Sequence, residues 1–528
     1  MAAAAPAQLD PGARPADLGR TPPMTLPNGP LTRLLLIAVV LACLGAVGFW
    51  ALAPDDSCAP GVYERDKECV GVTDGSFVFT PALRQVSERI KAENDSLAGK
   101  PAATIALMIP MVSEAAAERR EFVEQVQGAY LAQWKANHEA NNKQPPIRLL
   151  LANPGPGYRQ WRAVSDQLVS AAADPKQNLR AVVGINISIP ETEQAIRYLT
   201  KEKGISVVAG PMTADDIMNT AAEPQRYPGL VRIAPSNTDQ VNALAAYGAA
   251  IKPEESLVVE DIREGDNYLS SLRKTFERLA RKAPIAPETF RSPPNFNDES
   301  NLANDFHQMV PNICASPANT IYFAGRPVQL RQFLIELGDR TCTKHYTVIT
   351  GSHASTLMVD EKFAGKWGAL KKGSGITVRY SALAHPDAWG AQSTEATGGS
   401  RTAMKELSDL LRTGGSTTPD AIGPAELIDG RIIITYDAVT TAITGIRNET
   451  TKTVTMPSLR NVTDSWLQLK GTSRVEGASG WICLDKYGNP NNKAVPIVHL
   501  DPAAKVAVFD AVAWPLGHAP DRNCSIPN

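Results

Sequence analysis

The feature that most limits the fold of this chain is a regular alternation of short apolar runs with longer amphipathic segments, which begins near residue 100. Apolar runs of about 4–8 residues are typical of buried strands, and longer amphipathic segments are typical of helices. Strands that alternate with helices predict parallel sheets covered by helices on both faces. The apolar runs lie at 104–109, 147–152, 179–183 and 205–209, and the helix-like segments at 113–140, 159–172 and 191–203.

The alternation restarts after Pro235, which predicts a second sheet. The whole chain is 43% hydrophobic and contains 38 glycines, a composition that excludes a mainly disordered, collagen-like or coiled-coil protein. A net charge of −2 offers no global field for nucleic acid, so affinity has to come from a local site. The second array has runs at 256–260, 320–324 and 346–350 and helical segments at 268–281, 302–310 and 327–338, followed by helical 403–411 and 432–446.

Residues 34–53 form an apolar stretch without a charged side chain, long enough as a helix to span about 30 Å. Arg33 precedes the stretch and Asp55 follows it, so the positive-inside rule predicts a single-pass transmembrane helix with a cytoplasmic N-terminus and the bulk of the chain outside the cell membrane. Residues 1–33 are rich in proline and alanine and are expected to be a disordered cytoplasmic tail. Cleavage as a signal peptide and lipidation at Cys43 are two open alternatives.

Six cysteines follow the apolar stretch, which itself contains the seventh, Cys43. An even number of cysteines on the oxidising side of a membrane predicts disulfide bonds. Several connectivities are open, and pairing of sequence neighbours is the simplest. The spacing contains no C-x-x-C pair, which argues against zinc or redox chemistry at these cysteines, and we expect no metal and no cofactor. The candidate pairs are Cys58 with Cys69, Cys314 with Cys342, and Cys483 with Cys524.

Five strings between residue 231 and residue 498, taken in order, carry a resemblance to a known family. They include Val231-Arg-Ile-Ala-Pro235, Tyr322-Phe-Ala-Gly-Arg326, Val348-Ile-Thr-Gly351, Tyr436-Asp-Ala-Val439, and Val475-Glu-Gly-Ala-Ser-Gly480 with its continuation through Asp485 and Gly488 to Val498. The chain resembles type 1 periplasmic-binding proteins, the leucine/isoleucine/valine-binding fold of ABC transport, in an actinobacterial membrane-anchored form.

The resemblance covers about residues 100–515 and implies an α/β fold with two lobes, each a parallel sheet flanked by helices, placed after the N-terminal transmembrane helix. It also implies that the chain crosses between the lobes three times. The expected parts are the tail 1–33, the transmembrane helix 34–53, an extracellular stalk 54–98, lobe one at 99–236 and 388–466, lobe two at 237–387 and 467–518, and a C-terminal tail 519–528.

Two loops of lobe one are the first candidates for a ligand site, because parallel sheets bind ligands at the carboxyl ends of their strands. Asn186 and Ser188 follow the run 179–183 and open a helix, whose N-terminus favours a carboxylate. The resemblance implies that Ser188 holds the carboxylate of a ligand. It also implies that Ala209, Gly210 and Thr213 contact the ligand through backbone groups and a hydroxyl. Ser188 as a turn or cap residue, and Thr213 as the cap of a following helix, are the competing interpretations.

Lobe two offers three further candidates, Tyr268, Arg326 and His353. Family members often place an aromatic ring over the ligand near Tyr268, which can instead simply pack in the core. Arg326 follows a strand and can pair with an anionic ligand or lie solvated on a rim. Amino-acid-binding members have an acid near His353, and a neutral imidazole supplies no negative charge, which argues against an ordinary α-amino acid. A surface position is the competing interpretation of His353.

The resemblance implies an extracellular solute-binding protein that captures a small polar ligand, amino-acid-like or carboxylate-bearing, between two hinged lobes for an ABC importer. The expected partners are this small molecule, an ABC permease and, through residues 34–53, a membrane, with no nucleic acid. Two functions of other classes stay open: a membrane-anchored sensor ectodomain that signals through a partner, and an anchored extracellular hydrolase. The sequence holds no H-E-x-x-H, G-x-S-x-G or P-loop motif, which argues against an enzyme.

Overall fold

The computed structural model describes residues 57–138, 144–248, 252–283, 285–295, 298–390, 397–414 and 421–526. The expected tail 1–33 and transmembrane helix 34–53 lie outside these residues. Within the described part of the chain, no helix combines the length and the apolar character that crossing a membrane requires.

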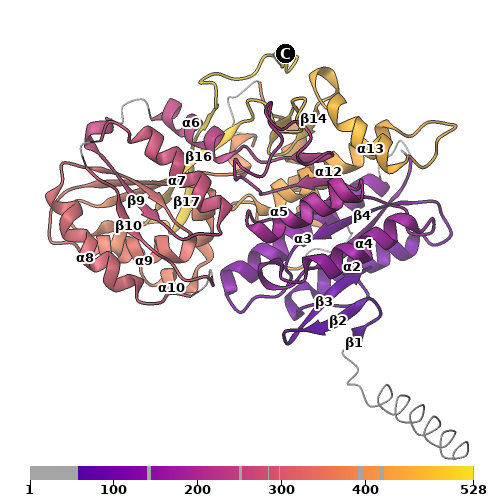
Figure 1. Ribbon diagram of the computed structural model, residues 1–528, viewed down its shortest axis with the longest axis horizontal. Helices are drawn as coiled ribbons and strands as arrows, with labels where there is room; N and C mark the ends of the chain where they lie inside the picture. The colour runs from indigo at the N-terminus through magenta and orange to yellow at the C-terminus, as the bar shows by residue number, and fades with distance from the viewer. Residues whose placement is uncertain are drawn as a thin grey trace, which may run out of the picture. The chain divides into compact units, whose positions relative to one another are not determined.

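The first sheet has eight strands in the order β1-β2-β3-β5-β4-β6-β7-β8 (Figure 1). Its five strands from β5 to β8 are parallel, as the alternation predicts, and β1 to β3 add an antiparallel edge. The strands are β1 (Ser57–Ala59), β2 (Val62–Arg65), β3 (Glu68–Thr73), β4 (Ala103–Met108), β5 (Ile147–Asn153), β6 (Leu179–Gly184), β7 (Ser206–Ala209) and β8 (Leu230–Arg232).

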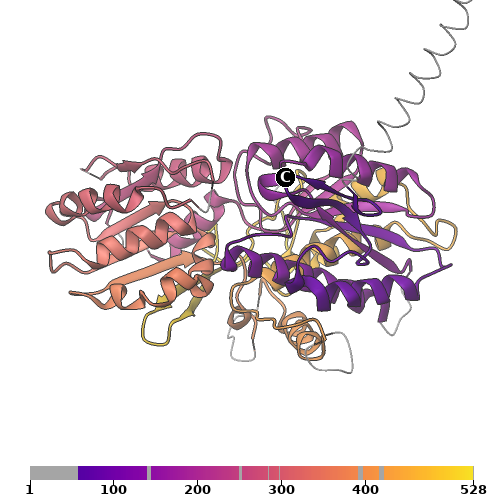
Figure 2. The ribbon, with the colours of Figure 1, turned by 90° about the horizontal axis from the view of Figure 1, so that it is seen from below.

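Alternate side chains of these strands enter two separate cores. Ile105 and Leu107 of β4 pack with helices α2, α3 and α12, whereas Ala106 and Met108 pack with α4 and α5 on the opposite face. This is the period-two burial of a strand covered on both sides, and Figure 2 shows helices on both sides of the sheet. The helices are α2 (Arg84–Ser96), α3 (Ala116–His138), α4 (Trp161–Ala173), α5 (Pro190–Arg197) and α12 (Arg431–Asn448).

The second sheet has seven strands in the order β10-β9-β11-β12-β13-β16-β17. Strands β10 to β13 are parallel, and β16 and β17 complete the sheet as antiparallel strands. Helices α8 and α9 cover one face, and α6 and α7 cover the other. The elements are α6 (Asn237–Tyr247), β9 (Ser256–Asp261), α7 (Asn267–Leu279), β10 (Glu288–Phe290), α8 (Leu302–Ala315), β11 (Thr320–Ala324), α9 (Pro327–Gly338), β12 (Tyr346–Thr350), α10 (Glu361–Ala364), β13 (Ile376–Ser381), β16 (Val495–Asp501) and β17 (Val506–Ala513).

The two lobes expected from the resemblance are present, and the chain passes between them three times. Ala234 belongs to the core of the first lobe and Val241 to that of the second. Ala382 and Leu383 lie in the cores of different lobes, as do Ala494 and Val495. The remaining elements, α11 (Arg401–Thr413), α13 (Leu459–Ser465), β14 (Val475–Gly477) and β15 (Gly480–Ile482), follow the second crossing and precede the third.

Three expected boundaries differ from the structure. The second part of lobe one was expected from residue 388, but Leu383 and Ala384 already lie in the core of that lobe. The segment expected as a stalk, 54–98, instead contributes β1, β2 and β3 to the first sheet, and Val86 and Ile90 of α2 enter its core. The segment 467–518 was expected in lobe two, but Val475 and Ile482 pack in the core of lobe one, and only β16 and β17 join the second sheet. The short edge strands β1–β3 carry mixed polar and apolar residues, so no long apolar run marks them in the sequence.

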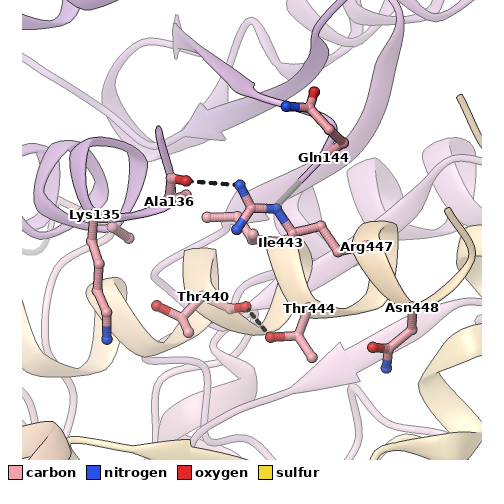
Figure 3. A pocket seen from close by; sticks show the side chains of 9 residues that line it. Lys135, Ala136, Gln144, Thr440, Ile443, Thr444, Arg447 and Asn448 are labelled. Atoms are coloured by element: carbon pink, nitrogen blue, oxygen red, sulfur yellow. Dashed lines mark hydrogen bonds between the residues drawn. The ribbon is translucent and has the colours of Figure 1, made fainter. Parts of the chain in front are cut away.

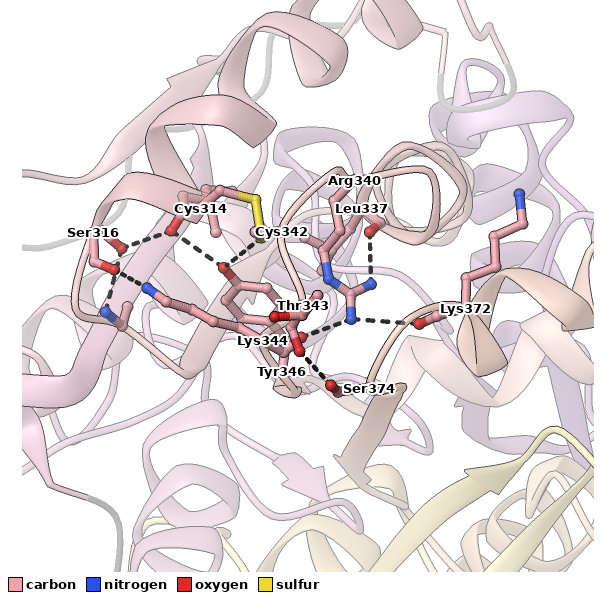
Figure 4. The surroundings of a disulfide bond; sticks show 12 residues. Cys314, Ser316, Leu337, Arg340, Cys342, Thr343, Lys344, Tyr346, Lys372 and Ser374 are labelled. Atoms are coloured by element: carbon pink, nitrogen blue, oxygen red, sulfur yellow. Dashed lines mark hydrogen bonds between the residues drawn. A yellow bond between two sulfur atoms is a disulfide. The ribbon is translucent and has the colours of Figure 1, made fainter.

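All six cysteines outside the apolar stretch form disulfides between sequence neighbours: 58 with 69, 314 with 342, and 483 with 524. The simplest of the open connectivities is therefore the one present. Figure 4 shows Cys314 and Cys342 beside Tyr346, whose hydroxyl donates to the carbonyl of Ile313 at 3.3 Å. The bond between Cys483 and Cys524 ties the C-terminal tail to the β14–β15 hairpin.

Two of the strings that carry the resemblance, at 436–439 and 475–498, form a buried polar connection between α12 and the β14–β15 hairpin. Asp437 of α12 accepts from the backbone N–H groups of Ala478 at 2.9 Å and Ser479 at 2.7 Å. Lys493 donates to the hydroxyl of Ser479 at 3.0 Å, and both Asp437 and Lys493 are buried. Gly488 adopts a φ of +82°, and a Cβ there would lie 2.2 Å from the carbonyl of Leu230. These residue types are therefore required by the turn and by the close packing.

Candidate functional site

The two loops predicted to bind a ligand in lobe one lie side by side. Strands β6 and β7 are parallel neighbours, and the N–H of Gly210 donates to the carbonyl of Gly184 at 3.1 Å. The hydroxyl of Ser188 accepts from the N–H of Ala214 at 3.3 Å. Ser188, Ala209, Gly210 and Thr213 therefore gather at the carboxyl ends of two adjacent strands, as the strand order requires.

Asn186 is held inside the first of these loops. Its side-chain oxygen accepts from the hydroxyl of Tyr158 at 2.9 Å, and its N–H donates to the same hydroxyl oxygen at 3.0 Å. Tyr158 also reaches the carbonyl of Met108 at 3.2 Å, and burial raises the pKa of its hydroxyl far above the usual value. Asn186 thus fixes the path of the loop; its contact with a ligand stays a prediction.

Neither Ser188 nor Thr213 caps a helix. Helix α5 begins at Pro190 with Ile189 as the N-cap residue, and the chain after Thr213 runs through turns to β8 without a helix. The competing interpretation of Thr213 as a cap is therefore wrong. Both side chains are buried, at 3% and 2% exposure, and the carbonyl of Thr213 accepts from the N–H of Asn237 at 2.7 Å.

Arg326 of lobe two is buried in an ion pair and does not lie on a solvated rim. Its Nε donates to one carboxylate oxygen of Asp266 at 3.0 Å, and its Nη2 donates to the other at 2.9 Å. Asp266 is also the N-cap of α7, where it accepts from the N–H of Leu269 at 3.0 Å. Burial would raise the pKa of Asp266, but the guanidinium groups of Arg326 and Arg263 hold it below the usual value.

Tyr268 and His353 stack on each other beside Arg326. Their ring centroids lie 4.8 Å apart, and the guanidinium carbon of Arg326 lies 4.9 Å from the centroid of Tyr268. Nη1 of Arg326 lies 3.3 Å from Nδ1 of His353. Since guanidinium groups only donate, Nδ1 accepts, and the imidazole is neutral. Burial, together with the charges of Arg326 and Arg431, holds the pKa of His353 well below its usual value.

The two lobes meet at the loops of lobe one and the first turn of α7. The N–H of Tyr268 donates to the carbonyl of Ser188 at 3.2 Å. The N–H of Asp215 donates to the hydroxyl of Ser271 at 3.0 Å, and the side-chain amide of Asn267 donates to Asp216 at 3.0 Å. The structure therefore brings the lobe-one candidates into contact with Tyr268. The ring of Tyr268 in turn contacts His353 and Arg326.

The sequence patterns did not predict Arg431, a charged residue of lobe one whose charge acts on His353. Arg431, at the start of α12, is 2% exposed and donates to Glu121 of α3 at 3.0 Å. Burial raises the pKa of Glu121 to about 7, although Arg431 and Arg326 act in the opposite direction. Burial and the neighbouring Asp429 raise the pKa of Glu124 to about 10. Asp429-Gly-Arg431 stands only a few residues before the recognised string at Tyr436, which is the signal that could have found it.

A separate cavity of about 310 Å³ lies between α3 and α12, away from these residues (Figure 3). Lys135, Thr440, Thr444 and Arg447 are among its lining, and Arg447 donates to the carbonyl of Ala136 at 2.8 Å. None of the residues predicted to bind a ligand lines this cavity. Among the described residues, no group of three or more His, Cys, Asp or Glu side chains is placed to hold a metal ion.

No family model and no curated protein matches this chain. Solved structures do match. A leucine-binding protein from Thermotoga maritima superposes with a TM-score of 0.54 at 16% identity, covering 78% of this chain and 98% of that one. A branched-chain amino acid transporter substrate-binding protein from Streptococcus pneumoniae, in complex with isoleucine, gives 0.56 at 14% identity, covering 78% and 99%. An ABC transporter solute-binding protein from R. palustris, in complex with 4-hydroxybenzoate, gives 0.53 at 14%, covering 78% and 96%.

These similarities establish the fold. The described residues have the two-lobed α/β fold of ABC-transporter substrate-binding proteins, so this part of the fold class expected from the resemblance is confirmed. Because the similarity spans nearly the full length of each solved protein, both lobes take part in it.

Proposed function

We propose that the protein captures a small carboxylate-bearing solute between its two lobes and passes it to an ABC importer, without catalysing a reaction. The observation that carries this proposal is the meeting of three elements: the loops after β6 and β7, with Ser188 and Thr213, and the first turn of α7, with Tyr268. Hydroxyl and backbone donors at the start of a helix suit a carboxylate. The ligands of the similar solved proteins, isoleucine and 4-hydroxybenzoate, both carry one.

We further propose that residues 34–53 anchor the protein in the cell membrane with the N-terminus in the cytoplasm. The support is the uncharged apolar stretch with Arg33 before it and Asp55 after it. The three disulfides agree with a lobe pair on the oxidising side. A protease added to intact cells should remove the bulk of the chain and leave the N-terminal tail protected.

The capture proposal is tested by a thermal-shift screen of the purified full-length protein against amino acids, monocarboxylates, dicarboxylates and hydroxybenzoates. A ligand present at 100 times its Kd stabilises the folded state by about 2.7 kcal/mol, which such a screen detects. Thr213→Ala should weaken binding of the solute found with little change in melting temperature, whereas Ser188→Ala should weaken binding and also lower the melting temperature, because the N–H of Ala214 loses its acceptor. Ser170→Ala, on the exposed face of α4, is the matched control and should bind normally. Unchanged affinity in both site variants would refute the assignment.

A further inference from the structure

Arg232 is a buried arginine with two donor nitrogens that lack an acceptor. It lies on β8, just before the first crossing between the lobes, and is 1% exposed. Its Nη1 donates to the carbonyl of Ala214 at 2.8 Å and lies 3.5 Å from that of Ile217. Its Nε and Nη2 have no hydrogen-bond partner within the described protein. A buried charged group whose donors lack acceptors destabilises the arrangement in which it is found.

Nε and Nη2 lie on one edge of the guanidinium group, and this edge fits the two oxygens of a carboxylate. The same protein shows such a pair at Arg326, whose Nε and Nη2 donate to the two oxygens of Asp266. Burial lowers the pKa of Arg232, and the charges of nearby aspartates act in the opposite direction, that of Asp215 most strongly. The aspartates are Asp215, Asp239, Asp216 and Asp485.

Asp485 and Asp239 already accept from donors of their own elements. Asp485 accepts from the N–H groups of Tyr487 at 2.8 Å and Asn489 at 2.9 Å, within its own turn. Asp239 accepts from the N–H of Ser236 at 3.3 Å and from its hydroxyl at 3.0 Å, at the start of α6. These contacts persist when the lobes move relative to each other, because donor and acceptor lie in the same element.

Asp215, in contrast, is held by donors of the opposite lobe. Its Oδ1 accepts from the N–H of Thr238 at 3.3 Å, and its Oδ2 accepts from the hydroxyl of Ser271. Thr238 and Ser271 belong to α6 and α7 of lobe two. Asp215 directly follows Ala214, whose carbonyl accepts from Arg232. Separation of the lobes would therefore release the carboxylate of Asp215 beside a guanidinium edge that lacks an acceptor.

Resting on the capture function proposed above, we propose that Arg232 is a positioning residue that shifts the ligand-free protein toward an open arrangement of its lobes. In the open arrangement, Nε and Nη2 of Arg232 donate to the two oxygens of Asp215. In the closed arrangement, Asp215 returns to Thr238 and Ser271. The ion pair offsets the contacts that opening breaks. A solute that binds both lobes has to supply the free energy of this exchange, so Arg232 limits its apparent affinity.

Arg232→Met in the full-length protein removes the guanidinium group and keeps the contacts of Asp215 with lobe two. Small-angle neutron scattering in contrast-matched detergent should give a smaller radius of gyration for the ligand-free variant than for the wild type. The solute found in the screen should bind about threefold to tenfold more tightly, because a larger fraction of the protein is closed before it binds. Arg148→Met on β5, whose Nη1 donates to the carbonyl of Lys176 at 3.2 Å, is the matched control and should behave as the wild type. A radius in Arg232→Met that equals or exceeds that of the wild type would overturn the proposal.

Arg232→Lys tests the paired nitrogens without removing the charge. Lysine keeps a donor for the carbonyl of Ala214 but lacks an edge with two parallel N–H groups. The radius and the affinity should shift in the same direction as in Arg232→Met, by a smaller amount. This variant decides the question if the methionine variant does not fold. A wild-type radius in Arg232→Lys would overturn the two-nitrogen pair.

A double-mutant cycle with Asp215→Asn tests the partner, because an uncharged amide forms no ion pair with Arg232. In the Asp215→Asn background, Arg232→Met should leave the radius unchanged. In the background of Asp216→Asn, whose native carboxylate accepts from Asn267 of lobe two, it should keep its full effect. A full effect in the Asp215→Asn background would overturn the assignment to Asp215. If the screen finds no solute, the capture function fails, and the radii of the ligand-free variants still decide whether Arg232 holds the lobes apart.

Discussion

Gly351 allows Tyr268 and His353 to stack where they do. A Cβ at residue 351 would lie 2.3 Å from the hydroxyl of Tyr268, although the backbone angles there suit any residue. Gly351→Ala should displace Tyr268 and weaken ligand binding by tenfold or more, with a stability loss of about 1–3 kcal/mol from overpacking. Gly365→Ala is the control, because a Cβ there meets nothing within 4 Å. Ligand titration and thermal melts of both variants measure these two effects. Normal binding in Gly351→Ala would contradict the proposal that Tyr268 contacts the ligand.

Asp437 carries most of the polar connection between α12 and the β14–β15 hairpin. Asp437→Ala would leave two buried N–H groups without an acceptor and remove the negative charge near Lys493, whose pKa burial lowers to about 8. We expect a loss of about 3–5 kcal/mol in the free energy of unfolding, measured by urea denaturation. Asp464→Ala, in an exposed pair with Arg460, should cost less than about 1 kcal/mol. Similar losses of unfolding free energy in the two variants would argue against a stabilising role of Asp437 between α12 and the hairpin.

The sequence pattern predicts the positions of the candidate residues that follow strands, but not those of the residues that helices supply. Ser188, Thr213 and His353 stand within five residues after apolar runs, and strand ends of a parallel sheet gather at one edge, so their loops could be predicted. Glu121 and Arg431 are 310 positions apart on two helices, and only the packing of α3 against α12 brings them together. The burial of Arg326 depends likewise on Asp266, a partner that the sequence pattern does not reveal.

At the scale of elements, the second crossing between the lobes contains a buried histidine. His385 is 1% exposed, accepts from the N–H of Asp387 at 3.2 Å and stacks on Phe509 of β17. Burial lowers its pKa to about 4, although Asp387 acts in the opposite direction. The unfolded chain binds this proton near pH 6.5, so the contribution of His385 to stability is present above pH 6.5 and is lost as the pH falls through 4.

We therefore expect His385→Asn, which keeps an acceptor for Asp387, to lose less stability than the wild-type protein between pH 7 and pH 4. The difference should approach about 3 kcal/mol, the free energy that corresponds to the lowered pKa. Urea denaturation at several pH values measures it. His307→Asn, at an 80% exposed side chain, should keep the wild-type slope. A wild-type slope in His385→Asn as well would show that this histidine does not titrate as described.

The N-terminal elements include strands that the sequence pattern did not predict. The long apolar runs of β4 to β7 predicted the parallel part of the first sheet. The mixed residues of β1–β3 gave no such signal, because edge strands are buried on fewer sides. A fragment that begins at residue 99 would lack three strands and the apolar face of α2, so binding experiments need the chain from residue 57 onward.

At the scale of the whole lobe pair, Ser271 connects the lobes without belonging to the proposed ligand contacts. Its hydroxyl accepts from the N–H of Asp215 at 3.0 Å and from the side-chain amide of Asn237 at 3.1 Å. Ser271→Ala should shift the lobes toward other arrangements, because it removes an acceptor shared by donors of both lobes. We expect a larger radius of gyration in solution scattering and a several-fold weaker affinity. Ser170→Ala should match the wild type, and an unchanged radius in Ser271→Ala would contradict the connection.

We propose above that the carboxylate of the ligand binds where the loops after β6 and β7 meet α7. The most direct test is a crystal structure of the protein with the tightest-binding solute from the screen. We expect a ligand carboxylate about 2.7–3.2 Å from the hydroxyl of Ser188 or Thr213, with the rest of the ligand directed toward Arg326 and His353. A ligand bound only in the cavity between α3 and α12, or on the outer surface of one lobe, would contradict it.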